Sequence, residues 1–404
     1  MARTYRGWSR KELARALGRD PAHVYPDTDN PKIDFLVALA DALEWPLDAV
    51  VEYLWVGLSP EAGREVPGGM TFDELDRQVM ELEQRGEHTK ALEHIRAMHS
   101  LARTPLEHAR ACRRECSAWD GLGRYSKSLA AAQLGLRQRP LPHEFQLVLQ
   151  ALMANAHYAL GDLTPAIGIA SCVIDWFARH VPDSLQGEAT HAFAHYVRGN
   201  SQREMIGSTD GQDGACEWAS RAQADLATAC RLYQEAGERH DREDFRAVAN
   251  TCAGGLLDVE VELGKRDANE TVDVLLAGVP TAQTAAPRDR SDWVESWAWW
   301  CVFAGGIALR RLDGARLQQV VAVASGTLLE LADRLDNWAL RQRALLMQHH
   351  ANEKLARQSG LRFDATIDDE DMRIIAGTMG RFPGFRPVGW RILESAKVVR
   401  NEIV

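Results

Sequence analysis

The chain has 404 residues, of which 46% are hydrophobic and 26% charged, and its formal net charge is −10 at pH 7. This is the composition of a well-folded protein, and the length exceeds that of one compact domain unless the chain is a repeat array. The acidic balance excludes a protein that coats nucleic acid or membrane surfaces through its overall charge, although a local basic face remains possible.

The N-terminal segment begins with the most basic stretch of the sequence, because residues 1–19 hold six Lys or Arg residues against Glu12 alone. Ser9 and Glu12 have the spacing of a helix capping box. Leu13 and Leu17 then follow at helical spacing, and Gly18 marks a turn. These features predict a short amphipathic helix that starts directly after Ser9.

The segment "SRKELARALG" (residues 9–18) resembles the second helix of the Cro/repressor-type helix-turn-helix family, also called the xenobiotic-response-element family. "NPKIDFLVALADALEWPLDAVV" (residues 30–51) resembles its fourth and fifth helices over an apolar stripe that includes Leu36, Leu39 and Leu43. The resemblance implies a DNA-binding module over residues 1–57. The positions that would face DNA are Ser9, Arg10, Arg19, Ala22 and His23.

Two departures from the family weaken this interpretation. The expected recognition helix is shortened to "DPAHVY" (residues 20–25) because Pro26 would end it, and only eight residues precede Ser9, so the first helix is nearly absent. Residues 1–50 hold seven Lys or Arg against eight Asp or Glu and exert no net electrostatic pull on DNA. A module retained only for packing or dimerisation therefore remains the alternative.

A Gly- and Pro-rich linker is predicted at residues 58–70, and repeats follow it. Gly86, Gly123 and Gly161 lie 37 and 38 residues apart, each suited to the left-handed position after a helix. A small residue that permits close helix packing follows each glycine five residues later, at Ala91, Ser128 and Ala166.

This pattern resembles the tetratricopeptide repeat, a stacked helix-turn-helix unit, and it is strongest over residues 71–179. We expect an all-α fold in which helical pairing extends to about residue 360. A turn at Asp313–Gly314, loops at 207–214 and 280–292, and a helical cap at 361–404 complete the prediction.

In such a solenoid the first helix of each pair lines an inner groove. The resemblance implies a peptide- or partner-binding groove at Gln78, Arg114, Trp119, Asn155 and Tyr158, although a solvated helix face has the same composition. Trp293, Trp297 and Trp300 form one helical stripe with Trp299 on another side, and such a stripe is more often core than a binding site.

No pattern of catalytic or cofactor-binding residues is found, so we predict a protein that is not an enzyme and holds no cofactor or metal. His191 and His195 lie one turn apart without a third ligand, and the adjacent His349 and His350 are expected to point apart. The seven cysteines fit reduced cytosolic thiols. The apolar run at 296–309 is too short to span a bilayer and is expected to form a buried helix.

The combined resemblance implies a cytoplasmic bacterial transcription regulator that binds operator DNA as a homodimer and senses a peptide or protein through its solenoid. The alternative is a solenoid adaptor that does not bind DNA and keeps a vestigial helix-turn-helix. Pro26 and the short recognition segment favour the adaptor, whereas the intact flanking helices and the basic start favour the regulator.

Overall fold

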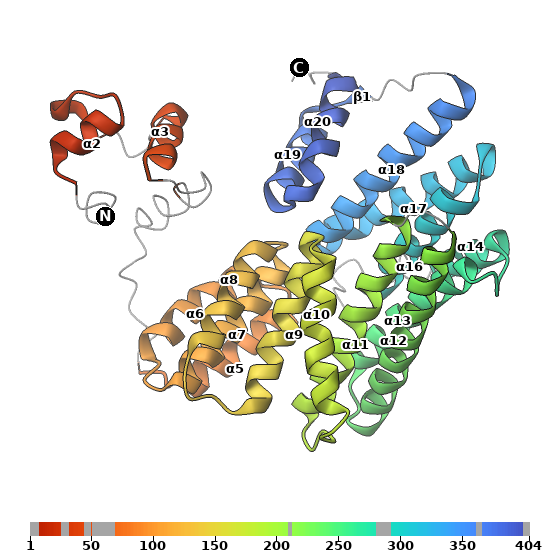
Figure 1. Cartoon of the computed structure of the whole chain (residues 1–404), viewed down its shortest axis with the longest axis horizontal. Coiled ribbons are helices and arrows are strands. Elements are labelled where there is room, and N and C mark those ends of the chain that lie inside the picture. The colour runs from red at the N-terminus through yellow and green to blue at the C-terminus, as the bar shows by residue number, and fades with distance from the viewer. Residues whose placement is uncertain are drawn as a thin grey trace. The chain divides into compact units, whose positions relative to one another are not determined.

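The computed structural model describes residues 8–25, 32–43, 50, 69–208, 212–279, 292–360 and 366–398. The chain forms two compact units, Met1–Met70 and Thr71–Val404 (Figure 1). The fold is all-α, as predicted. In the described ranges the only strands are β1 (Thr366–Ile367) and β2 (Lys397–Val398), which pair in parallel over two residues each.

The N-terminal unit contains α2 (Arg10–Ala16), the 3-10 turn η1 (Pro21–His23) and α3 (Ile33–Leu43). The predicted capping box is present, because Ser9 accepts a hydrogen bond from the Glu12 amide and Glu12 accepts one from the Ser9 amide. Gly18 has a φ of +62°, which turns the chain after α2. The apolar core of the unit is Leu13, Ala14, Leu17, Val24, Phe35, Leu36, Leu39, Ala40, Leu43 and Val50.

Three helical hairpins open the second unit at the predicted places. They are α5 (Phe72–Gln84) with α6 (His88–Leu101), α7 (Pro105–Gly121) with α8 (Tyr125–Arg137), and α9 (His143–Leu160) with α10 (Leu163–Phe177). Gly86, Gly123 and Gly161 have φ values of +71°, +66° and +86°, which confirms their left-handed positions. Ala91, Ser128 and Ala166 are buried, as close packing of the second helices requires.

Seven further helices of the described ranges, all but α14 longer than those of the hairpins, continue the solenoid to Gly360, where we expect the helical pairing to end. These are α11 (Leu185–Met205), α12 (Gln212–Arg239), α13 (Glu243–Glu262), α14 (Ala268–Ala277), α16 (Asp292–Arg311), α17 (Gly314–Leu335) and α18 (Trp338–Ser359). The turn at Asp313–Gly314 is confirmed. The predicted loop 207–214 was drawn too long, because the 3-10 turn η2 covers Ile206–Ser208 and α12 already starts at Gln212. Residues 280–291 of the other loop, Pro26 and most of the predicted linker lie outside the described residues.

The C-terminal segment consists of α19 (Asp369–Arg381), the 3-10 turn η3 (Pro383–Phe385) and α20 (Arg386–Ser395). These elements pack against α18, as expected of a cap. They also reach back to the second hairpin, because the Phe382 ring lies 5.8 Å from the Tyr125 ring and Arg381 Nε donates to the Leu122 carbonyl. The segment therefore joins two parts of the solenoid that are more than 250 residues apart in sequence.

Candidate functional site

The predicted DNA-facing arginines are engaged by their own unit. Arg10 Nη2 donates to the Ala22 carbonyl at 3.0 Å, and its guanidinium lies 5.5 Å from the Tyr25 ring centre. Arg19 lies 3.8 Å from the Asp34 carboxylate and 4.8 Å from the Phe35 ring. These contacts hold α2, the η1 turn and α3 together, and they reduce the freedom of both charges to reach a phosphate.

The recognition segment is a single 3-10 turn, as its length predicted. Asp20 caps it by accepting a hydrogen bond from the Ala22 amide at 2.6 Å, so a carboxylate occupies the end of the turn that would face DNA. Ala22 and His23 are exposed beside it. A role of these two residues and of Ser9, the helix cap, in DNA binding remains a prediction.

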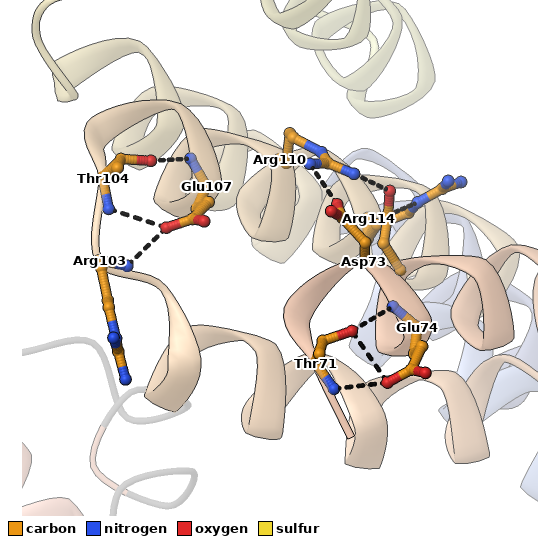
Figure 2. A network of polar contacts seen from close by, with 9 residues as sticks. Thr71, Asp73, Glu74, Arg103, Thr104, Glu107, Arg110 and Arg114 are labelled. Carbon is orange, nitrogen blue, oxygen red and sulfur yellow. Dashed lines mark hydrogen bonds and ion pairs between the residues drawn. The ribbon is translucent and has the colours of Figure 1, made fainter. Parts of the chain in front are cut away.

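Arg114, predicted in the groove, instead lies in a buried ion network between the first two hairpins. Its Nε donates to Asp76 at 2.6 Å and its Nη1 to Glu83 at 3.1 Å. Figure 2 shows Arg110 reaching Asp73 beside it, at 2.8 Å. Burial alone would raise the pKa of Asp76, but the hydrogen bonds from both arginines outweigh burial and lower it. Arg114 thus fixes α7 on α5, and its guanidinium is already used.

Trp119 and Gln78 lie in half-buried positions on the same first helices, α7 and α5. The Trp119 indole donates to Glu115 at 3.1 Å, and the Lys127 ammonium lies 4.1 Å from its ring centre. Trp119 therefore packs within its own hairpin.

Asn155 and Tyr158 lie on the wall of a cavity of about 310 Å³, which we call the acidic cavity. Its volume is at the lower end of the range of ligand pockets. Its wall comes from helices spread over the whole solenoid and from the C-terminal segment. The lining residues include Asp120, Tyr125, Asn155, Tyr158, Tyr196, Tyr233, Asp292, Glu295, Trp299, Arg343 and Phe382.

Two carboxylates dominate the electrostatics of the acidic cavity. Asp120, at the end of α7, accepts a hydrogen bond from Asn155 Nδ2 at 2.9 Å. Glu295, on α16, accepts one from the Trp299 indole at 3.2 Å and one from Asn337 at 3.1 Å. Burial, followed by repulsion from Glu295, raises the pKa of Asp120 to about 7, and burial also raises the pKa of Glu295. Both carboxyl groups therefore hold a proton more readily than an exposed acid does.

Trp297, Trp299 and Trp300 pack against the apolar core, and Trp299 also lines the acidic cavity. Trp300 Nε1 donates to the Asn250 carbonyl at 2.8 Å, and the Trp297 and Trp300 rings pack edge to face with centres 4.6 Å apart. Both are half-buried and pack against the apolar core formed around Phe303 and Ile307, as expected of a helical stripe. Trp299, which the sequence placed on another side of the helix, lines the acidic cavity.

Sequence reasoning missed most of the cavity wall. Asp120, Glu295, Arg343 and Phe382 come from distant segments, and no local spacing links them. One weak signal was available, because Glu295 and Trp299 are four residues apart on one helix and their side chains meet.

The histidine pairs give one agreement with expectation and one correction. His195 Nδ1 lies 2.7 Å from buried Asp225, and His191 stacks on Phe177, so this pair packs. His349 and His350 were expected to point apart. Instead one ring nitrogen of each and a Glu353 carboxylate oxygen lie within 4.8 Å of one another. The correction arises because Glu353, one turn later, contacts both rings. Arg391 also contacts Glu353 at 3.4 Å and would compete with a metal ion.

Comparisons with known proteins give little. No family model matches the sequence, and no curated protein matches it. Among solved structures, the chain is similar to Bacillus thuringiensis PlcR in its crystal structure with the peptide PapR7 and DNA. The TM-score is 0.37 at 14% identity, over 70% of this chain and 96% of that one. Similarity at this level assigns no family. In the described ranges, no helix combines the length and apolarity needed to cross a membrane.

Proposed function

We propose that the protein is a cytoplasmic transcription regulator whose N-terminal unit binds operator DNA and whose solenoid senses a peptide. The observation that carries the proposal is the packing of the N-terminal unit. Leu13, Val24 and Leu39 are buried in one core, and the capping box and the Gly18 turn are intact.

The acidic cavity supports the sensing half of the proposal. Its wall includes Tyr125 from the second hairpin, Glu295 from α16 and Phe382 from the C-terminal segment. A ligand in the cavity would contact the second hairpin, α16 and the C-terminal segment at once. It would therefore favour conformations in which these three parts lie at the distance that the ligand bridges. By the sequence resemblance, the protein would act as a homodimer, and coupling to DNA binding would run through residues 58–70.

The test of DNA binding uses fluorescence anisotropy with sheared genomic DNA at low and moderate salt. The full chain is compared with an Arg10→Ala/Arg19→Ala variant and with a control, Arg77→Ala, that changes an exposed arginine of the solenoid. We expect binding that survives moderate salt, enriches one sequence and is lost only in the double variant. Hydrogen exchange of residues 8–25 establishes that the variant unit stays folded.

A second candidate function, a solenoid adaptor without DNA binding, is favoured by the contacts of the recognition segment. Asp20 caps the η1 turn, and Arg10 and Arg19 already have partners within the unit. Under this alternative, DNA binding would be weak, erased by salt and equal in the double variant and the control. That outcome would reject the regulator proposal.

A further inference from the structure

We infer that the acidic cavity receives the basic side chain of a bound peptide, a lysine ammonium or an arginine guanidinium, between Asp120 and Glu295. The inference rests on the proposed peptide sensing and specifies what the site selects. It follows from three properties of the cavity: carboxylates that form no ion pair with a described residue, tyrosine side chains in the wall, and an arginine whose charge is already balanced.

Among the described residues, the two carboxylates have neutral hydrogen-bond partners. Asp120 accepts from an Asn155 amide, and Glu295 accepts from the Trp299 indole and the Asn337 amide. Within the described ranges neither carboxylate forms an ion pair. Placing two acids near each other in a partly desolvated cavity costs free energy, which an intervening cation would offset. Burial accordingly raises the pKa of both groups, with repulsion from Glu295 adding to it at Asp120 and repulsion from Asp292 adding to it at Glu295.

Three tyrosines form part of the wall of the acidic cavity. Tyr125, Tyr158 and Tyr233 are 8%, 9% and 5% exposed, and all three line the acidic cavity. Their hydroxyls make no hydrogen bond with any residue that the structure describes. These three side chains therefore bring polar groups to the cavity wall that a bound ligand can use. Their aromatic rings also offer faces that attract a cation.

The wall also contains one positive group, Arg343, which would favour an anion if it were unpaired. Its Nη1 donates to Glu204 at 3.2 Å, and Glu204 also accepts from Arg203. Attraction to Arg343 and Arg203 lowers the pKa of Glu204 to about 2 despite its burial. Glu204 is therefore ionised and balances Arg343, so the excess charge of the cavity is negative.

The test measures binding of four blocked amino acids to the full chain by saturation-transfer NMR and calorimetry at about pH 8, where Asp120 is ionised. The probes are the Nα-acetyl methylamides of arginine, lysine, norleucine and glutamate, which share a backbone and differ in side-chain charge. We expect the arginine and lysine probes to bind at least about tenfold more tightly than norleucine, and the glutamate probe not to bind.

Two variants locate the effect, Asp120→Asn and Glu295→Gln, because each keeps a side-chain oxygen that can accept the existing hydrogen bonds. Each variant should weaken the binding of the two basic probes by about tenfold. The affinity of the norleucine probe should stay unchanged, which would show that the cavity is intact. The matched controls are Asp175→Asn and Glu93→Gln, at exposed positions outside the cavity. They should leave all four affinities unchanged.

Three results would overturn the inference. These are equal binding of norleucine, tightest binding of glutamate, and no binding of any probe up to about 10 mM. None of them concerns DNA, so the anisotropy test of the regulator can succeed when this inference fails. Conversely, basic probes can bind as expected to a protein that never binds DNA.

Discussion

The N-terminal unit and the acidic cavity differ in whether their charged side chains have partners. In the N-terminal unit, Arg10 and Arg19, which the sequence assigned to DNA, bind a carbonyl, a carboxylate and two rings of the same unit. In the cavity, Asp120 and Glu295 have no cationic partner among the described residues and accept hydrogen bonds only from neutral groups. A charge that already has a partner stabilises the fold, whereas a partly buried charge without one is available to a ligand.

Position along the sequence does not reveal this difference. Arg114 was predicted to face a ligand and is fixed by Asp76 and Glu83, whereas Asn155 from the same set lies on the cavity wall. Four predictions test whether paired and unpaired charges behave as this comparison requires.

The largest effect is expected at Asp258, a fully buried acid with cationic partners. It accepts hydrogen bonds from Arg203 and Arg310, so Asp258→Ala leaves two partly buried guanidinium groups short of a partner. We expect the free energy of unfolding to fall by about 3–5 kcal/mol in urea titrations. Asp175→Asn, at an exposed position, should change it by less than about 0.5 kcal/mol. If Asp258→Ala lowered the free energy of unfolding by no more than Asp175→Asn does, the ion pairs of Asp258 would not stabilise the fold.

The second effect concerns the pH dependence of binding. A cation requires ionised Asp120, whose pKa is about 7, so the affinity of the arginine probe should rise about tenfold between pH 6 and pH 8. The pKa values of Glu295 and Asp292 are also raised, so ionisation of these groups likewise increases the affinity for a cation as the pH rises. The pKa values of Arg343 and Tyr125 are also raised, so both keep their protonation state in this interval. Calorimetry in a pH series provides the measurement, and a flat profile in the native protein would contradict the role of Asp120.

A smaller effect is expected on stability in the absence of ligand. Burial raises the pKa of Asp120 above its ordinary value of 3.8, so the folded state holds a proton that the unfolded state releases between about pH 4 and pH 7. Stability is therefore lost as the pH rises through this interval. Asp120→Asn removes the loss and should raise Tm at pH 8 by about 2 °C, with no gain at pH 4. A lower Tm at pH 8 would mean that Asp120 is a structural acid like Asp258.

The smallest effect is expected at Arg10. Its contacts with Ala22 and Tyr25 lie at the surface, so Arg10→Ala should speed amide exchange in residues 8–25 by only about threefold. Exchange in α5 and α7 serves as the internal reference. Exchange as slow as in the native protein would mean that Arg10 contributes nothing to the unit and is free for DNA.

The sequence was a good guide wherever a local rule controls the chain. Gly86, Gly123 and Gly161 correctly predicted the hairpin turns, because only glycine adopts a left-handed conformation without steric cost. Ser9 and Glu12 correctly predicted the start of α2, because the hydrogen bonds of a capping box join residues three positions apart. It was a poor guide to the C-terminal segment, whose contact with Tyr125 depends on the curvature of the whole solenoid.

The sequence by itself determined the helical hairpins and the packing of Trp297 and Trp300 against the core, because helix periodicity, caps and turns act over one or two helical turns. Only the tertiary structure decided which charges are paired. Asp120, Glu295 and Arg343 lie on three helices far apart in the chain, and their separation depends on how small rotations between successive hairpins add up. Pairing is a property of that accumulated geometry, so the acidic cavity could be recognised only after the chain had been folded.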